Sequence, residues 1–341
     1  MKTVSVKNTI LAVISYFLFF SCGGGGNESC REQPDIDNIS INVEIERLDR
    51  AIFQAESAAE INRIMKKNPV LAGYYLPEAA IAGDTSTLAD LYAMVNDESL
   101  DTLYQETQSI FGEMEELEEE YTRAFKNFKY YIPGFNPPEV KAMVTGLAGY
   151  ADLYVSDTLL LVGADYFLGP KATYRPVNTP QYMMRRYTSD YIVPSSLLFL
   201  SQSYNSVDES NNSLLADMIY YGKSYYMVSV AMPCLPDSTL MGYTSREMEG
   251  VKFNKEQIWK HFIDNNLLYE TNHFTKTKYT GERPNTFEIS NEAPGRVGIW
   301  LGLDIVRQYM DKNPDVSVEE LMRTADVQQI FEQSRYRPDR D

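Results

Sequence analysis

Residues 212–232 read NSLLADMIYYGKSYYMVSVAM and form the most apolar stretch beyond the N-terminal segment. The stretch predicts a buried helix of several turns, and Gly222 marks the point at which such a helix would break. Asp217 interrupts the apolar run, and a buried carboxylate is costly unless it is paired. We therefore expect a basic or hydroxyl partner for Asp217, with Lys223 and Arg296 as the candidates.

The same helix carries a group of polar side chains that suggests a site. Asp217 and Tyr221 are four residues apart and share a face. Tyr220 and Lys223 are three apart and also share one. We favour a structural polar cluster whose members satisfy one another, and the alternative is a binding or degenerate catalytic site that also uses Arg296. Tyrosine is abundant in the whole chain, with 25 residues, so its enrichment here supports ligand binding only weakly.

Strand patterns lie N-terminal to this helix. Residues 39–47 (ISINVEIER) alternate apolar and polar side chains, which is typical of a half-buried strand. Residues 140–150 and 157–165 read as two more strands, joined by a turn near residues 152–156. The last strand is apolar almost throughout, so we expect elements to cover both of its faces.

Helical patterns account for most of the remaining chain. The spacing of Thr244 with Glu247, and of Ser317 with Glu320, is that of capping boxes. Helices are predicted at residues 58–67, 77–81, 87–96, 100–112, 113–131, 179–187, 194–204, 254–268, 295–312 and 327–336. No internal repeat and no second flexible linker divides the chain. The sequence thus predicts one domain over residues 38–341, of the α+β class but mainly α, with a small sheet and about ten helices.

The first thirty residues have the plan of an export signal. Lys2 and Lys7 precede an apolar run, residues 9–20, which is too short to span a bilayer comfortably. Ser21 and Cys22 follow, and then four glycines. This pattern resembles a bacterial lipoprotein signal, in which the cysteine thiol receives a diacylglycerol and the peptide is cut before the cysteine.

We therefore predict a signal peptide over residues 1–21, lipidation of Cys22 and a flexible tether over residues 22–37. An uncleaved anchor helix and a plain signal peptide are the alternatives. Acyl chains would then attach the protein to the membrane. The expected location is the cell envelope, with the folded body facing the periplasm.

The charge balance excludes some partners. The net charge is −17, and removal of residues 1–21 takes away Lys2 and Lys7 and no acid, which gives −19. A surface this acidic offers no basic stripe for phosphate, so we expect neither nucleic acid nor anionic headgroups as ligands. The glutamates of residues 113–120 precede basic residues in one helix, an order that complements the helix dipole without a calcium site.

Two cysteines remain once Cys22 is lipidated. Cys30 lies in a polar segment, residues 27–37, that is expected to be disordered. Cys234 follows Met232-Pro233 at the end of the apolar helix. A disulfide between them would pin the tether to the body, and the sequence leaves that pairing open. Two cysteines cannot make a disulfide framework, so the fold must depend on an ordinary core.

The sequence offers little for catalysis. It lacks a phosphate-binding glycine loop, a dinucleotide fingerprint and a G-x-S-x-G elbow. Its two histidines, His261 and His273, do not have the spacing of zinc ligands. We therefore expect no metal, no cofactor and no enzymatic activity.

Four blocks of sequence suggest a relationship. They are VGADYFLG at 162–169, LLADMIYYGK at 214–223, QIWKHFIDNNLLY at 257–269 and APGRVGIWLGLDIVRQY at 293–309. Together with the lipoprotein start, they resemble the GldB family of gliding-motility lipoproteins of the Bacteroidetes. The resemblance covers essentially all of the chain after the signal.

That family is itself distantly similar to gluzincin-type zinc proteases. In those proteins the helix matching residues 214–223 would carry H-E-x-x-H, with the glutamate as the general base. Here Ala216 and Tyr220 stand at the two histidine positions and Asp217 stands at the glutamate position. The resemblance therefore implies a zincin-like scaffold with a degenerate, metal-free site.

The sequence and the resemblance together suggest a lipid-anchored envelope protein that acts through protein contacts. Its partners would be envelope proteins, such as motility or secretion machinery. The alternative is a hydrolase or ligand-binding lipoprotein that uses Asp217, Tyr220 and Lys223. Capture of sugars by exposed tyrosines is a third hypothesis, which depends on the tyrosine count alone.

Overall fold

The computed structural model describes residues 30–75, 85–147, 152–177 and 179–338. The predicted signal peptide, Cys22 and the helix predicted at residues 77–81 lie outside these residues. The described helices are α1 (Leu48–Phe53), α2 (Ala58–Lys67), α3 (Pro69–Tyr75), α5 (Thr85–Val95), α6 (Glu98–Phe111), α7 (Glu115–Tyr131), α8 (Gln181–Met184), α9 (Ile192–Gln202), α10 (Leu214–Ala231), α11 (Asp237–Met241), α12 (Ser245–Phe253), α13 (Lys255–Asp264), α14 (His273–Thr280), α15 (Val297–Lys312), α16 (Val318–Arg323) and α17 (Val327–Ser334). Three 3-10 turns, η1 (Ala164–Phe167), η2 (Ser189–Tyr191) and η3 (Leu267–Tyr269), complete the helical elements.

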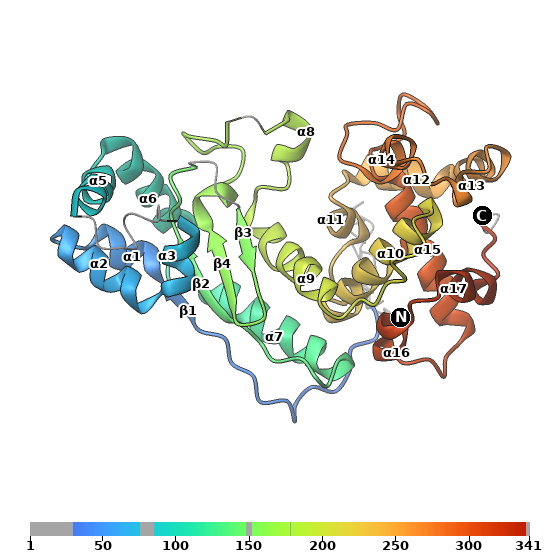
Figure 1. Cartoon of the computed structure of the whole chain (residues 1–341), viewed down its shortest axis with the longest axis horizontal. Helices are drawn as coiled ribbons and strands as arrows, with labels where there is room; N and C mark the ends of the chain where they lie inside the picture. The colour runs from blue at the N-terminus through green and yellow to red at the C-terminus, as the bar shows by residue number, and fades with distance from the viewer. Residues whose placement is uncertain (1–29, 76–84, 148–151, 178, 339–341) are drawn as a thin grey trace, which may run out of the picture.

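The prediction of a mainly α member of the α+β class is confirmed, with more helices than expected. The strands are β1 (Ile45–Arg47), β2 (Glu139–Met143), β3 (Leu153–Val155) and β4 (Leu159–Gly163). The sheet and helices α1 to α7 lie at one end of the molecule, and helices α10 to α17 form a helical body at the other (Figure 1). Helix α9 lies between the two parts (Figure 1).

The four strands form one sheet in the order β1-β2-β4-β3. The first three strands of that order run parallel, and β3 pairs antiparallel with β4. Every residue of β4 is buried, as the apolar stretch predicted. The sequence missed β3, which occupies the predicted turn. A tight hairpin, in which the N–H of Ser156 donates to the carbonyl of Leu159 at 2.8 Å, brings β3 alongside β4.

The first predicted strand is shorter than expected, because α7 occupies much of its edge. Only residues 45–47 pair with β2. The backbone N–H of Val43 donates to Thr122 Oγ1 at 2.9 Å, and that of Ile45 donates to Glu118 Oε1 at 2.8 Å. The acidic first half of α7 therefore also holds the strand, besides complementing the helix dipole.

The predicted apolar helix is confirmed as α10, which is continuous through Gly222. A side chain at Gly222 would place its Cβ 2.5 Å from the carbonyl oxygen of Gly302 in α15. A Cβ at Gly302 would in turn overlap the carbonyl of Met218. Gly222 is thus a point of close helix approach and not a break, because the two backbones nearly touch there.

Both predicted capping boxes are confirmed, at Thr244 with Glu247 and at Ser317 with Glu320. Their hydrogen bonds satisfy N–H groups that the first helical turn leaves without partners. The single helix predicted over residues 254–268 is instead α13 followed by η3, because Asn266 adopts a left-handed backbone conformation between them.

The segment before β1 is attached to the helical body. Cys30 forms a disulfide with Cys234. The N–H of Arg31 donates to the carbonyl of Pro233 at 2.9 Å, and its guanidinium pairs with Asp237 at 2.7 Å. The prediction of disorder is therefore wrong for residues 30–37, since the polar composition that suggested it is outweighed by a covalent link.

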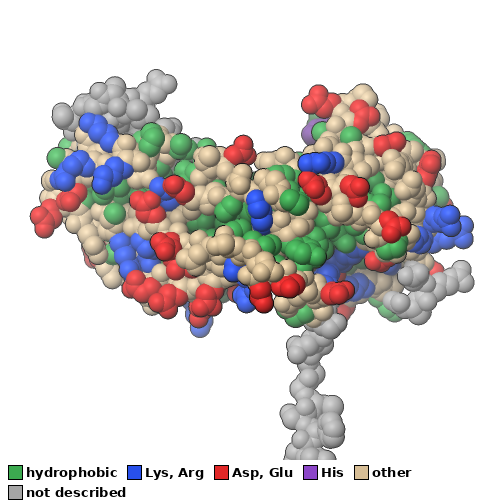
Figure 2. Space-filling model, turned by 90° about the horizontal axis from the view of Figure 1, so that it is seen from below, with side chains coloured by type: hydrophobic (Ala, Val, Ile, Leu, Met, Phe, Trp, Pro, Cys, Tyr) green, Lys and Arg blue, Asp and Glu red, His purple; other side chains and the backbone are tan. Residues whose placement is uncertain are grey.

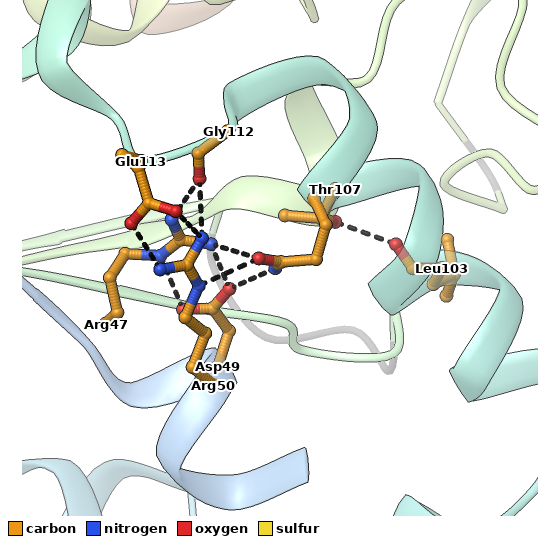
Figure 3. A network of polar contacts seen from close by, with 8 residues as sticks. Arg47, Asp49, Arg50, Leu103, Thr107, Gly112 and Glu113 are labelled. Carbon is orange, nitrogen blue, oxygen red and sulfur yellow. Dashed lines mark hydrogen bonds and ion pairs between the residues drawn. The ribbon is translucent and has the colours of Figure 1, made fainter. Parts of the chain in front are cut away.

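A network of polar side chains attaches β1 and α1 to the turn between α6 and α7 (Figure 3). The carboxylate of Asp49, which is fully buried, receives hydrogen bonds from Arg47 at 2.9 and 2.6 Å. Gln108 donates to the same carboxylate at 2.8 Å. Arg50 pairs with Glu113 at 2.8 Å. These contacts fix β1 and α1 against the turn between α6 and α7.

No helix among the described residues is long and apolar enough to cross a membrane.

Candidate functional site

The five residues predicted as a cluster do not form one site. Asp217 lies apart from the other four residues. Its side chain is 33% exposed and pairs with Lys276 Nζ at 2.8 Å. Lys276 comes from α14 and also donates to the carbonyl of Asn212 at 2.7 Å. The expected partner of Asp217, either Lys223 or Arg296, is therefore wrong, and the carboxylate serves to attach α14 to the start of α10.

Lys223 is buried and has partners of its own. Its ammonium donates to the carbonyls of Ser206 and Thr324, both at 2.8 Å, and to that of Met322 at 3.3 Å. Burial lowers the pKa of Lys223 to about 8. The three carbonyls satisfy all the donors of an ammonium group. Lys223 therefore ties α10 to two distant loops and has no donor left for a substrate.

The two tyrosines of the predicted cluster contact each other. The rings of Tyr220 and Tyr221 meet edge to face with centroids 5.3 Å apart. Burial raises the pKa of both phenols, and in Tyr221 the nearby carboxylate of Asp217 adds to this effect. Both hydroxyls therefore stay protonated at neutral pH, and the pair provides packing between α10 and its surroundings.

Arg296 is buried at the start of α15, where its φ of 62° places it in the left-handed region. Its guanidinium donates to Tyr225 Oη at 3.0 Å and to the carbonyl of Met241, and it pairs with Glu282 at 3.3 Å. Burial by itself lowers the pKa of Arg296, but Tyr225 and Glu282 raise it overall. Arg186 reaches the same carboxylate through two bonds of 2.9 Å.

The space around Arg296 is too small for a ligand. One cavity between α9, α11 and Arg296 has a volume of about 60 Å³, and one beside Glu282 has about 10 Å³. Ligand pockets usually have about 300 Å³ or more. The arginine and glutamate side chains here therefore hold α8, α11 and α15 together.

A groove of about 470 Å³ has the size that these cavities lack, and it is our candidate functional site. It opens between α7, η2 and the turn after α10, beside the Cys30–Cys234 disulfide. Charged side chains on its lining are Glu120, Arg123 and Asp190. The remaining lining is mainly apolar and comes from Ala124, Ala231, Met232, Pro233, Cys234, Leu235 and Pro236, with Gln33, Asn127 and Thr239.

The sequence contained only part of the signal for this groove. Glu120 and Arg123 are three apart on one helix face, a spacing that usually indicates a solvent-exposed ion pair. Asp190 and the turn at residues 232–236 come from distant parts of the chain. Only the fold, with the disulfide, brings them together.

Next to the groove, Asp237 is held by two arginines. Arg307 donates to both of its oxygens, at 2.7 and 2.6 Å, and Arg31 pairs with it at 2.7 Å. Burial alone would raise the pKa of Asp237, but the two guanidinium groups outweigh burial and lower the pKa to about 2. This carboxylate joins the segment after the disulfide to α11 and α15.

The low pKa of Asp237 predicts a contribution to stability that acid removes. A carboxylate whose pKa is lower in the folded than in the unfolded protein stabilises the fold at pH values above the unfolded pKa. This contribution is lost as the pH falls toward 2. Between pH 6 and pH 2 we expect Asp237 to account for about 2 kcal/mol of lost unfolding free energy. Urea unfolding of wild type and of Asp237→Asn at both pH values measures how much of the lost unfolding free energy comes from Asp237.

Asp315→Asn, which removes an exposed carboxylate, is the control for that comparison. It should lose as much stability as wild type on acidification, whereas Asp237→Asn should lose less. Equal losses for the three proteins would contradict the assignment.

The described residues contain no group of three His, Cys, Asp or Glu side chains that could hold a metal ion. Ala216, Asp217 and Tyr220, at the positions of a zincin motif, lie on the continuous helix α10. Asp217 forms an ion pair with Lys276 Nζ at 2.8 Å.

Comparison with models of known protein families identifies the family of this chain. The model described as "Gliding motility protein GldB" matches residues 29–338. The chain belongs to the GldB family. No curated protein and no solved structure matches it.

The match to the GldB family extends across the described fold. Both cysteines of the disulfide and the whole lining of the groove fall inside the matched residues. Cys22 falls before them. The resemblance inferred from four blocks of sequence is thereby confirmed for the GldB family, whereas the zincin-like relationship stays a prediction.

Proposed function

We propose that this GldB family protein is a lipid-anchored component of the cell envelope that supports gliding motility or secretion machinery through protein contacts and without catalysis. Family membership supports the motility role. The lipoprotein pattern at Ser21-Cys22 supports an anchor made of acyl chains. The periplasm is the expected side for the folded body.

The observation that carries the proposal is the groove beside the disulfide. It combines an apolar lining with charged side chains at a volume of about 470 Å³, and protein interfaces likewise combine an apolar centre with a polar rim. Cys30 lies eight residues after Cys22, a stretch that spans at most about 28 Å when fully extended. The groove would therefore be held within reach of the membrane surface.

The proposed anchor is tested with Cys22→Ser. Wild type should incorporate radiolabelled palmitate and sediment with membranes. The variant should lose essentially all label and appear in the soluble fraction, because a single thiol receives the lipid. Each protein is expressed in a cell lacking the gene, and both palmitate incorporation and membrane sedimentation are measured.

The variant with Cys30→Ser and Cys234→Ser is the control, because it removes two cysteines and should keep the label. Cys22→Ser that stays labelled and bound to the membrane would contradict the anchor. Normal spreading and secretion in the cell lacking the gene would contradict the role in motility and secretion.

The alternative of a hydrolase using Asp217, Tyr220 and Lys223 finds no support in the geometry. Asp217 pairs with Lys276, and Lys223 is occupied by backbone carbonyls. No described contact joins the three side chains as a nucleophile, a base and an orienting group would require. We therefore propose no second function.

A further inference from the structure

We propose that the groove between α7, η2 and the turn after α10 binds a segment of a partner polypeptide in which a lysine or arginine side chain is flanked by apolar residues. The inference rests on the proposed function in protein contacts and specifies the chemistry of the partner.

The groove is lined by one half-buried carboxylate, Glu120, and by two solvent-exposed charged side chains, Arg123 and Asp190. Within the described residues, Glu120, Arg123 and Asp190 have no hydrogen bond from their side chains and no ion pair within 4.0 Å. Glu120 is half-buried. Burial raises its pKa, and Asp190 raises it further, while Arg123 lowers it. Arg123 offsets part of the effect of burial but lies beyond ion-pair distance, so the carboxylate of Glu120 has no direct cationic partner among the described residues.

Two buried carboxylates of this protein, by contrast, are paired. Asp237 next to the groove has two arginines, and Asp49 has an arginine and a glutamine. A carboxylate withdrawn from water without a partner costs free energy, which a bound cation would recover. Glu120 therefore favours a ligand that brings a positive charge.

The rest of the lining favours a polypeptide over a simple cation. Ala124, Ala231, Met232 and Leu235 give the groove an apolar surface. Interfaces between proteins combine such an apolar centre with a polar rim. The groove's own Arg123 could pair with a carboxylate or a carbonyl of the same segment. Figure 2, which views the molecule from the side of α7, shows hydrophobic side chains gathered near the middle of this face and bordered by acidic and basic ones.

The charge of the whole chain points to the same partner. A net charge of −17 attracts basic partners and repels acidic ones. The protein's own tether is a poor occupant, because residues 22–29 read CGGGGNES and carry one acid and no base. The tether therefore brings no basic residue to the groove, and we assign the basic residue to another chain.

The test uses the full-length lipoprotein in nanodiscs of phosphatidylcholine, with empty nanodiscs as the background. Four fluorescein-labelled decapeptides differ only at a central Lys, Arg, Gln or Glu between leucines. Fluorescence polarisation should show the Lys and Arg peptides binding at least about tenfold more tightly than the Glu peptide, a difference of about 1.4 kcal/mol.

Two double variants test whether the preference for basic peptides arises in the groove. Glu120→Gln with Asp190→Asn should abolish the preference for the basic peptides and leave the fold intact, since it removes unpaired charges. Glu115→Gln with Glu119→Gln removes two exposed carboxylates from the same helix outside the groove, and it should keep the preference. Thermal unfolding checks that both proteins fold.

Three results of the binding test would overturn the inference, and a fourth result concerns the oligomeric state. They are equal binding of all four peptides, no binding of any peptide, and a preference that survives in the Glu120 and Asp190 variant. A dimer of the purified protein that dissociates on these substitutions would assign the groove to a second copy and overturn it as well. The label and fractionation of Cys22→Ser are independent of the groove, so failure here leaves the proposed anchor separately testable.

Discussion

Gly302→Ala is expected to lower the free energy of unfolding by about 3 kcal/mol, because the added methyl group has no space. Its Cβ would overlap the backbone carbonyl of Met218 in α10, and backbone cannot move aside as a side chain can. Helices α10 and α15 would have to separate along a contact on which the whole helical body depends. Urea unfolding followed by circular dichroism measures the loss.

Gly250→Ala is the matched control for that substitution. Gly250 lies within α12, and a Cβ there would meet no atom within 4 Å. Alanine loses less backbone entropy than glycine on folding, so this variant should gain about 0.5–1 kcal/mol. A loss of similar size in both variants would contradict the close approach of α10 and α15 as the cause of the loss.

Removal of the disulfide by Cys30→Ser with Cys234→Ser is expected to cost about 3–5 kcal/mol. The bridge joins residues 204 positions apart, so it restricts the unfolded chain strongly. It also holds Arg31 against Asp237 and Pro233. Denaturant unfolding should therefore show a lower midpoint, and protease should cut the double variant near residues 31–38 more rapidly than wild type.

Dithiothreitol provides an internal control for the disulfide. Wild type with this reductant should unfold like the double variant, and the double variant should not respond to it. Unchanged unfolding of wild type after complete reduction would contradict the stabilising role of the bridge.

Local patterns allowed much of the fold to be predicted. The apolar stretch of α10, the buried β4 and the two capping boxes depend on spacing within a few residues. Strand β3 was missed because three residues carry too little periodicity to distinguish a strand from a turn. The break expected at Gly222 was wrong because a glycine in a sequence does not reveal whether another backbone lies against it.

The candidate site was less predictable than the fold. Asp217 was expected to need a partner, and it has one, but Lys276 is 59 positions away in sequence (276 − 217) and gave no local signal. The groove draws Glu120, Asp190 and Cys234 from three separate parts of the chain. Helical spacing relates residues three or four apart and cannot relate these.

The sequence by itself determined the mainly helical class, the GldB resemblance and the acidic character of this protein, because composition, local periodicity and short motifs do not depend on how distant segments meet. Tertiary structure alone decided the pairing of Cys30 with Cys234, the partner of Asp217 and the groove beside α7. Each of these is a contact between residues far apart in the chain. Such contacts depend on the packing of whole helices, which the pattern within any one helix does not specify.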